Sequence, residues 1–100
     1  MGKNFVYKSY KKGNERLLAI ADAAIVGKEL SEKELQINVS ENFYHEKECD
    51  EKEALKLIKE ATIINAVGNN IISLIINNKI AEKENILYIG EVAHAQIFTL

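Results

Sequence analysis

Two side chains with binding or catalytic potential lie close together near the C-terminus. His94 carries an imidazole, which titrates near neutral pH and can act as a general base, a ligand or a hydrogen-bond partner. Gln96 lies two residues further on and shares a face with His94 if this segment forms a strand. The simplest interpretation is a histidine whose ring hydrogen-bonds loop backbone and fixes a turn. The functional alternative is contact with a ligand, and catalysis has the least support.

Uncharged polar residues recur with helical spacing in the second half of the chain. Asn65, Asn69, Ser73 and Asn77 are four residues apart, which predicts a narrow row along one edge of a helix. Such a row is either a set of amides bonded to loops and water or a binding edge. Gly68 interrupts it, and a glycine there indicates close approach of a neighbouring strand or chain.

Three more residues complete the candidate ligand site. Phe43 and Tyr44 are adjacent aromatics in an otherwise polar run, so one of them is expected to anchor that loop to the core. Asp22 can form a dyad with His94 only if its strand lies beside the last strand, and its simpler role is to cap a short turn. The candidate ligand-binding residues are therefore His94, Gln96, Asn65, Asn69, Phe43, Tyr44 and Asp22.

Positive charge is concentrated at the N-terminal end. Residues 1–16 hold five basic residues against Glu15, a net of +4, although the whole chain has a formal net charge of −2 and a pI near 5.7. The candidate nucleic-acid contacts are Lys8, Lys11, Lys12 and Arg16, with Tyr7 and Tyr10 available for stacking on bases. The alternative is a solvated hairpin end with aromatics in the core.

The motifs of metal and cofactor chemistry are absent from the sequence. His45 and Cys49 are four residues apart, but there is no Cys-x-x-Cys, no His-Glu-x-x-His and no second cysteine. Glycine-rich phosphate loops and a Gly-x-Ser-x-Gly turn are also missing. We therefore predict no metal, no cofactor and no assigned catalytic residue.

Local patterns predict the elements that position these residues. Residues 5–10 and 16–22 form a predicted hairpin, 35–40 alternates as a strand, and 86–89 and 95–100 are two further strands. Residues 50–78 have helical periodicity, with Asp50 as N-cap and Glu53 three residues on, and become almost wholly apolar after Ile63.

Strands grouped at both ends of the chain and helix in the middle predict an α+β fold. We expect a two-layer sandwich in which a mostly antiparallel sheet packs against one long or kinked helix with two helical segments. A chain of 100 residues supports one domain, over 1–100. One cysteine and no apolar N-terminal run or membrane span predict a cytoplasmic protein, and the isoleucine-rich helix suggests a possible homo-oligomer such as a dimer.

Several short motifs resemble a known family. They are Gly27-Lys28, Phe43-Tyr44, the run from Ala61-Thr62 through Asn65 to Gly68, and the closing Gly90-x-Val92-x-His94-Ala95-Gln96. Together they resemble the archaeal DUF424 family of small proteins, over essentially the whole chain. The resemblance implies a single-domain α+β protein and no particular activity, because the family is defined by unknown function.

The leading hypothesis is a small non-enzymatic binding or adaptor domain with a protein or RNA partner. Its expected surface combines Asn65 and Asn69 with the loops that carry Phe43, Tyr44 and His94. The alternatives are an RNA-associated accessory factor of translation, based on the basic hairpin, and an enzyme acting on a small ligand through His94.

Overall fold

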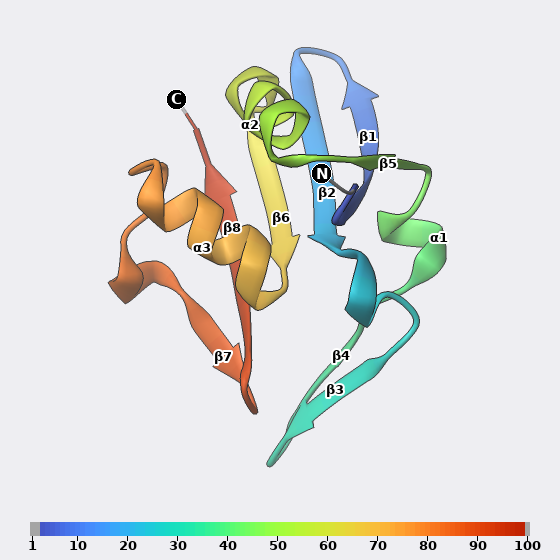
Figure 1. Ribbon diagram of the computed structural model, residues 1–100, viewed down its shortest axis with the longest axis vertical. Helices are drawn as coiled ribbons and strands as arrows, with labels where there is room; N and C mark the ends of the chain where they lie inside the picture. The colour runs from blue at the N-terminus through green and yellow to red at the C-terminus, as the bar shows by residue number, and fades with distance from the viewer. Residues whose placement is uncertain (1–2, 100) are drawn as a thin grey trace.

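A computed structural model describes residues 3–99 and shows an α+β fold (Figure 1). The strands are β1 (Phe5–Lys12), β2 (Glu15–Asp22), β3 (Glu29–Glu32), β4 (Leu35–Asn38), β5 (Lys47–Cys49), β6 (Ile63–Val67), β7 (Leu87–Ile89) and β8 (Val92–Phe98). The α-helices are α1 (Glu41–Tyr44), α2 (Glu51–Glu60) and α3 (Asn69–Asn77), and two 3-10 turns, η1 (Ala23–Ile25) and η2 (Lys83–Asn85), connect elements.

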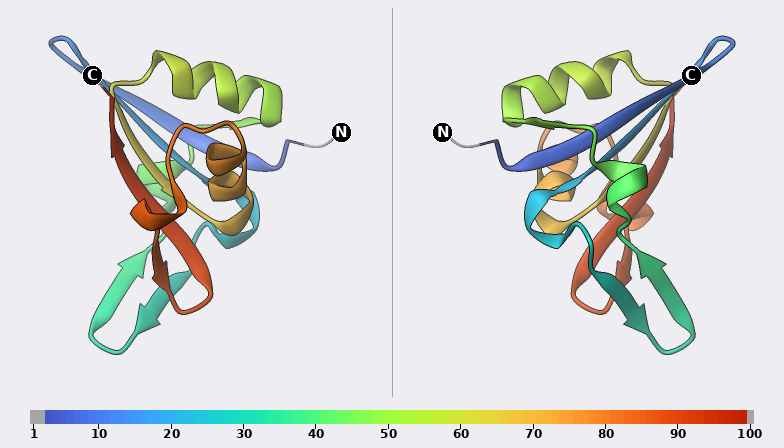
Figure 2. Two further views of the ribbon diagram at one scale, coloured as in Figure 1. Left: turned by 90° about the vertical axis from the view of Figure 1, so that its left-hand side faces the viewer. Right: turned by 90° about the vertical axis from the view of Figure 1, so that its right-hand side faces the viewer.

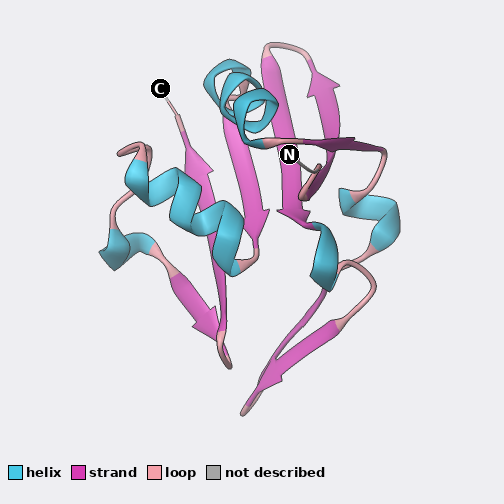
Figure 3. Ribbon diagram, in the orientation of Figure 1, coloured by secondary structure: helices cyan, strands magenta, loops and turns pink. Residues whose placement is uncertain are grey.

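Six strands form one sheet in the order β5-β1-β2-β6-β8-β7, and β3 pairs with β4 in a separate hairpin (Figure 3). Neighbouring strands are antiparallel except β2 and β6, which run parallel. The predicted N-terminal hairpin is present as β1 and β2, joined through Gly13, whose φ of +60° suits a tight turn. A mostly antiparallel sheet combined with helices confirms the α+β class.

The expectation of one long or kinked helix over 50–78 is wrong. Helix α2 ends at Glu60, and Ile63–Val67 forms the central strand β6 before α3 begins. The segment Ile63–Val67 is apolar except for Asn65, and such a segment fits a largely buried strand as well as it fits a buried helix, while its β-branched residues favour the strand. The predicted start of α2 is correct, because the Asp50 carboxylate accepts a hydrogen bond from the Glu53 backbone N–H at 2.9 Å.

The two faces of the sheet are covered to different extents (Figure 2). Helices α2 and α3 lie on one side, which we call the covered face. Its core includes Leu18, Ile20, Ile64, Ile71 and Ile75, all at most 2% exposed. On the opposite side α1, η1 and the β3–β4 hairpin pack over Val6, Ala21 and Val67 near one end of the sheet. The isoleucines of α3 therefore pack against the covered face of the sheet.

Other strand expectations hold only in part. Residues 35–38 do form a strand, but it pairs with the short polar strand β3, and Leu35 is 50% exposed where a core contact was expected. The last strand starts at Val92 rather than Ala95, so His94 lies inside β8 and not in the loop before it. The expected strand end at Leu100 falls outside the described residues.

Candidate functional site on the open face of the sheet

The side of the sheet opposite α2 and α3 is left uncovered toward the β1–β2 turn, and we call this part the open face. Strand register lines up its residues in rows. Tyr10 pairs with Leu17, Leu17 with Ile63, and Ile63 with Phe98, which makes one apolar row across four strands. The neighbouring row consists of Lys8, Ala19, Asn65 and Gln96. Phe98 is 67% exposed and Gln96 is also exposed, so the open face presents apolar and polar groups to solvent together.

Three aromatic rings border the open face. The rings of Tyr10 and Phe43 stack with centroids 5.4 Å apart, and Phe43 meets Tyr44 edge to face at 4.9 Å. The Tyr10 hydroxyl donates to the Phe43 carbonyl oxygen at 2.9 Å, which ties α1 to β1. Aromatic pairs of this geometry add stability beyond their burial, so the border holds its shape without a ligand.

A polar cluster lies where this border meets β6 and β8. The Tyr44 hydroxyl donates to Asn65 Oδ1 at 2.7 Å, and His94 Nε2 lies 3.3 Å from the same oxygen. An amide oxygen only accepts, so this contact requires the His94 tautomer with hydrogen on Nε2. The Nδ1 lone pair of His94 and the amide N–H groups of Asn65 have no hydrogen-bond partner among residues 3–99. The cluster therefore holds both acceptor and donor capacity for another molecule.

Burial sets the ionisation of this cluster. It lowers the pKa of His94, so the ring is neutral at pH 7, and it raises the pKa of Tyr44 to about 12. The tyrosine is thus a hydrogen-bond donor and not a base. Burial also raises the pKa of Cys49 to about 12, with Glu53 and Asp50 acting in the same direction, and its thiol lies in the core of the covered face. The groups around His94 are therefore neutral hydrogen-bonding groups at pH 7, and the Cys49 thiol lies apart from them in the core.

The sequence-predicted ligand residues fall into two groups. Phe43, Tyr44, Asn65, His94 and Gln96 gather on or beside the open face. Asn69 lies elsewhere, at the start of α3, where its side chain donates to the Glu91 carbonyl and accepts from the Ala93 N–H. The expected row from Asn65 to Asn77 is therefore divided, because Asn65 belongs to a strand and Asn69 to the next helix.

Asp22 forms no dyad with His94. Its carboxylate accepts hydrogen bonds from the backbone N–H groups of Asn70 and Ile71, at 2.9 and 2.8 Å. The parallel pairing of β2 and β6 explains this contact, because it brings the end of β2 beside the start of α3. Burial raises the pKa of Asp22, while the two N–H groups act to lower it. Asp22 thus caps α3 from another strand, and not the short turn that follows it.

Gly68 is explained by the same contact. A Cβ at this position would clash with the Asp22 carboxylate, and the residue has φ of +125°. Glycine therefore lets the carboxylate approach the first turn of α3, which is the close approach that the sequence indicated.

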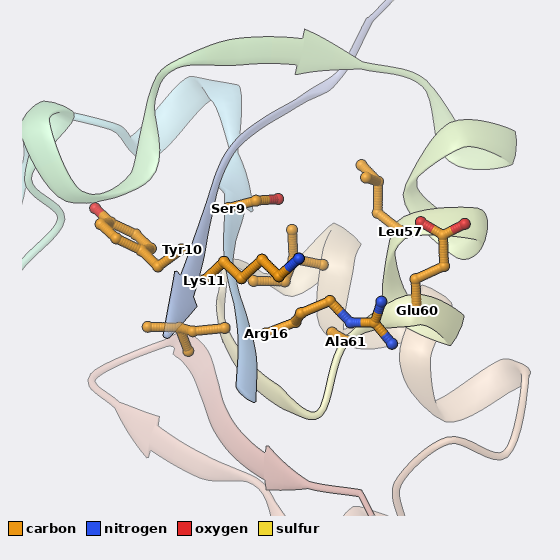
Figure 4. Close-up of a pocket in the computed structure, with 9 residues that line it drawn as sticks. Ser9, Tyr10, Lys11, Arg16, Leu57, Glu60 and Ala61 are labelled. Carbon is orange, nitrogen blue, oxygen red and sulfur yellow. The ribbon is translucent and has the colours of Figure 1, made fainter. Parts of the chain in front are cut away.

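The basic residues of the hairpin point to both sides. Lys8 lies on the open face, where its ammonium is 5.2 Å from the centre of the Tyr10 ring and 3.3 Å from the Asn42 carbonyl oxygen. Lys11 and Arg16 instead line a pocket beside α2 (Figure 4). Tyr7 is 8% exposed in the core of the covered face, so of the two tyrosines considered for stacking only Tyr10 is accessible.

Metal ligands do not cluster in the part of the chain that the structure describes. Within residues 3–99 no group of three His, Cys, Asp or Glu side chains is placed to hold an ion. Cys49 is buried, whereas His45 lies 3.9 Å from Glu41 and from Glu48 at the surface.

Sequence reasoning missed the apolar row of the open face. The sequence predicts Leu17 in a hairpin strand, Ile63 in a helix and Phe98 in the final strand, so it does not place them side by side. Alternation within each strand is visible in the sequence, but the row depends on the pairing of β2 with β6, which are 40 residues apart in the chain. The signal in the sequence was Phe98 itself, a large aromatic residue that shares a strand face with polar Gln96.

Comparison with known proteins agrees with the fold. The family model described as "Protein of unknown function (DUF424)" matches residues 10–100. This chain belongs to the DUF424 family. The crystal structure of an uncharacterized conserved protein from Methanopyrus kandleri is similar, with a TM-score of 0.81 and 28% identity over 96% of this chain and 91% of that chain. A search of curated proteins finds no match.

The DUF424 assignment confirms the resemblance and brings no activity with it, because the family is described as one of unknown function and the structural neighbour as uncharacterized. None of the helices in residues 3–99 is long and apolar enough to cross a membrane.

Proposed function

We propose that this DUF424 protein is a non-enzymatic binding or adaptor domain that uses its open face. The observation that supports this proposal most is the convergence of Tyr44 and His94 on Asn65 next to a partly exposed apolar row. Interfaces commonly combine apolar anchors with a few fixed polar groups, and aromatic residues are enriched in them.

The polar groups are held in place before any partner arrives. Asn65 Oδ1 is fixed by two donors, so its amide N–H groups have a defined direction. His94 adds an acceptor at Nδ1, and Gln96 pairs with Asn65 in register and is exposed. Groups that are ordered in the free protein lose less entropy on binding, which favours affinity.

Site-specific photo-cross-linking in the native host tests this proposal. A photoreactive residue at Gln96 is expected to give one discrete adduct, and the same residue at exposed Lys56 on α2 serves as the control. Asn65→Ala and His94→Ala should each reduce the Gln96 adduct. Equal adducts from both positions, or an adduct that neither substitution changes, would contradict the proposal.

An RNA partner is the second candidate, and a specific observation favours it. Lys8 shares the open face with the accessible ring of Tyr10, and Phe98 is exposed in the same apolar row. Aromatic side chains on a sheet stack on unpaired bases while lysines neutralise phosphates. This role corresponds to the RNA-associated accessory factor of translation considered above.

Fluorescence anisotropy with a labelled single-stranded RNA decides this candidate. Affinity should fall steeply as salt rises, and Lys8→Gln should lower the salt slope by about 1. Phe98→Ala should weaken binding, and Lys56→Gln is the control for charge loss away from the open face. Absence of binding at low ionic strength would remove RNA as the partner while leaving a protein adaptor role intact.

We propose a cytoplasmic location, and the open face as the contact if the protein self-associates. Phe98 and Leu87 are 67% and 47% exposed, whereas three of the α3 isoleucines that first suggested a dimer, Ile71, Ile72 and Ile75, are buried. Light scattering after size-exclusion chromatography should therefore show any dimer dissociating in Phe98→Ser. A dimer that persists in this variant would place the contact elsewhere.

A further inference from the structure

A pocket lies between the end of the β1–β2 hairpin and helix α2, on the covered side of the sheet (Figure 4). Its volume is about 190 Å³. Leu18, Leu57 and Ala61 provide apolar walls, and Ser9, Lys11, Arg16 and Glu60 provide polar groups. Figure 4 shows the Lys11 and Arg16 side chains extending toward α2, while Tyr10 points away from them.

The charged residues that line this pocket are two cations, Lys11 and Arg16, and one anion, Glu60, so the pocket has a net positive charge. Lys11 and Arg16 are directly opposite each other on β1 and β2, so two positive charges face one another across the strands. Like charges at such positions destabilise a sheet. The next pair, Lys12 and Glu15, has opposite charges on the other side of the hairpin. Among residues 3–99 neither Lys11 nor Arg16 has a carboxylate within 4 Å.

The backbone of Arg16 is fixed at the pocket edge. Its N–H donates to Thr62 Oγ1 at 2.8 Å, and its carbonyl oxygen accepts from the Thr62 N–H at 2.9 Å. Thr62 is held in turn by Thr99, whose N–H donates to the Thr62 carbonyl oxygen at 2.9 Å. The backbone of Arg16 therefore needs no rearrangement when the guanidinium binds an anion, which limits the entropy loss to that of the side chain.

We propose that this hairpin-end pocket binds a small organic anion, with its carboxylate or phosphate between Lys11 and Arg16 and its apolar part against Leu57 and Ala61. The size fits one ring, because an apolar cavity of about 150 Å³ accommodates benzene. An anion relieves the repulsion between the two cations, and the apolar walls favour a ligand with a hydrocarbon group over an inorganic ion. This site is separate from the open face, so the proposal does not depend on the proposed function.

Amide chemical shifts measured by NMR test the site with four probes. Benzoate and phenyl phosphate each carry a ring and an anionic group, inorganic phosphate carries only the charge, and benzyl alcohol carries only the ring. Benzoate or phenyl phosphate should shift the amides of Ser9, Arg16 and Leu57 in a saturable way. The tighter of the two identifies the preferred anion. Inorganic phosphate and benzyl alcohol should each bind more weakly than the two ring-bearing anions.

Matched variants distinguish binding in the pocket from nonspecific attraction to surface charge. Lys11→Gln and Arg16→Gln should each weaken binding about fivefold, the loss expected for one charge-assisted contact. Lys12→Gln removes the same charge one residue away, on the other side of the strand, and should change affinity less than about twofold. Ser9→Tyr places a ring in the pocket at an exposed strand position and should abolish binding without loss of thermal stability.

Two kinds of result would overturn the proposal, one from the wild-type protein and one from the variants. One is the absence of saturable shifts at these amides with both ring-bearing anions in the wild-type protein. The other is an equal loss of affinity in Lys11→Gln and Lys12→Gln, or full binding in Ser9→Tyr, because either outcome places the anion outside the pocket.

Discussion

The covered face and the open face are formed by alternate residues of the same strands, yet different elements pack against them. On the covered face, Leu18, Ile20 and Ile64 meet the isoleucines of α3, and the core is closed. On the open face, Leu17 and Ile63 are flanked by Tyr10 and Phe98, and within residues 3–99 helix α1 packs against this row only at its Tyr10 end, through the Phe43 ring. The same strand chemistry therefore gives stability on one side and an accessible apolar surface on the other.

The two adjacent isoleucines of β6 give the largest expected contrast. Ile64 is 0% exposed on the covered face, so Ile64→Ala should lower the free energy of unfolding by about 2–5 kcal/mol. Ile63→Ala makes the same chemical change on the open face and should cost about 1 kcal/mol or less, because this side chain is already partly in water. Urea unfolding of both variants measures the difference. Equal losses would mean that the open face is as closed as the covered face.

The next largest effect concerns the link between the sheet and α3. Gly68→Ala should cost about 2 kcal/mol or more, since the new Cβ meets the Asp22 carboxylate and the backbone has a positive φ. Asp22→Ala should cost about 1–3 kcal/mol, because it leaves the N–H groups of Asn70 and Ile71 without their acceptor.

A double-mutant cycle checks that these two residues act through each other. The double variant should be more stable, by about 1 kcal/mol, than the sum of the single losses predicts, because removing the carboxylate makes room for the Cβ. Additive losses would separate the Gly68 effect from Asp22 and assign it to backbone conformation alone.

Local chemistry predicted much of the covered face from the sequence. The aromatic and β-branched run before Gly13 and the apolar run after it gave the β1–β2 hairpin, and Asp50 with Glu53 gave the start of α2. Strand β6 was misassigned because Ile63–Val67 has no local signal that separates a buried strand from a buried helix. Strands β3 and β5 are short and mostly polar, with four and three residues, so neither has the alternation of a half-buried strand.

The arrangement of residues on the open face depends on contacts between segments that are distant in the sequence. The alternation that places His94 and Gln96 on one side of a strand is readable from the sequence. The meeting of Asn65 with Tyr44 depends on the position of α1 over the sheet, and the Asp22 contact depends on the parallel pairing of β2 with β6. Such contacts between distant segments follow from tertiary packing, which periodicity within one segment does not encode.

A smaller effect distinguishes the buried and accessible tyrosines of the aromatic border. Tyr44→Phe should lower the free energy of unfolding by about 1 kcal/mol, because it removes the hydrogen bond to Asn65 from a side chain that is 4% exposed. Tyr10→Phe removes a bond of similar length to the Phe43 carbonyl and should cost less, since Tyr10 is only half-buried and water can replace its hydroxyl. Denaturant midpoints at pH 7 compare the two. A greater loss for Tyr10→Phe would contradict the polar cluster as an ordered part of the open face.

The smallest expected effect is the pH dependence contributed by His94. Its folded-state pKa lies below the ordinary value of 6.5, because burial disfavours the charged ring. The stabilising contribution is therefore present above pH 6.5 and is lost as pH falls through the lower folded pKa. His94→Gln keeps a side chain that can donate to Asn65 and cannot titrate. Acidification should therefore lower the unfolding free energy of the wild type more than that of His94→Gln. If the difference between the two proteins did not depend on pH, the imidazole would lie in water rather than against Asn65.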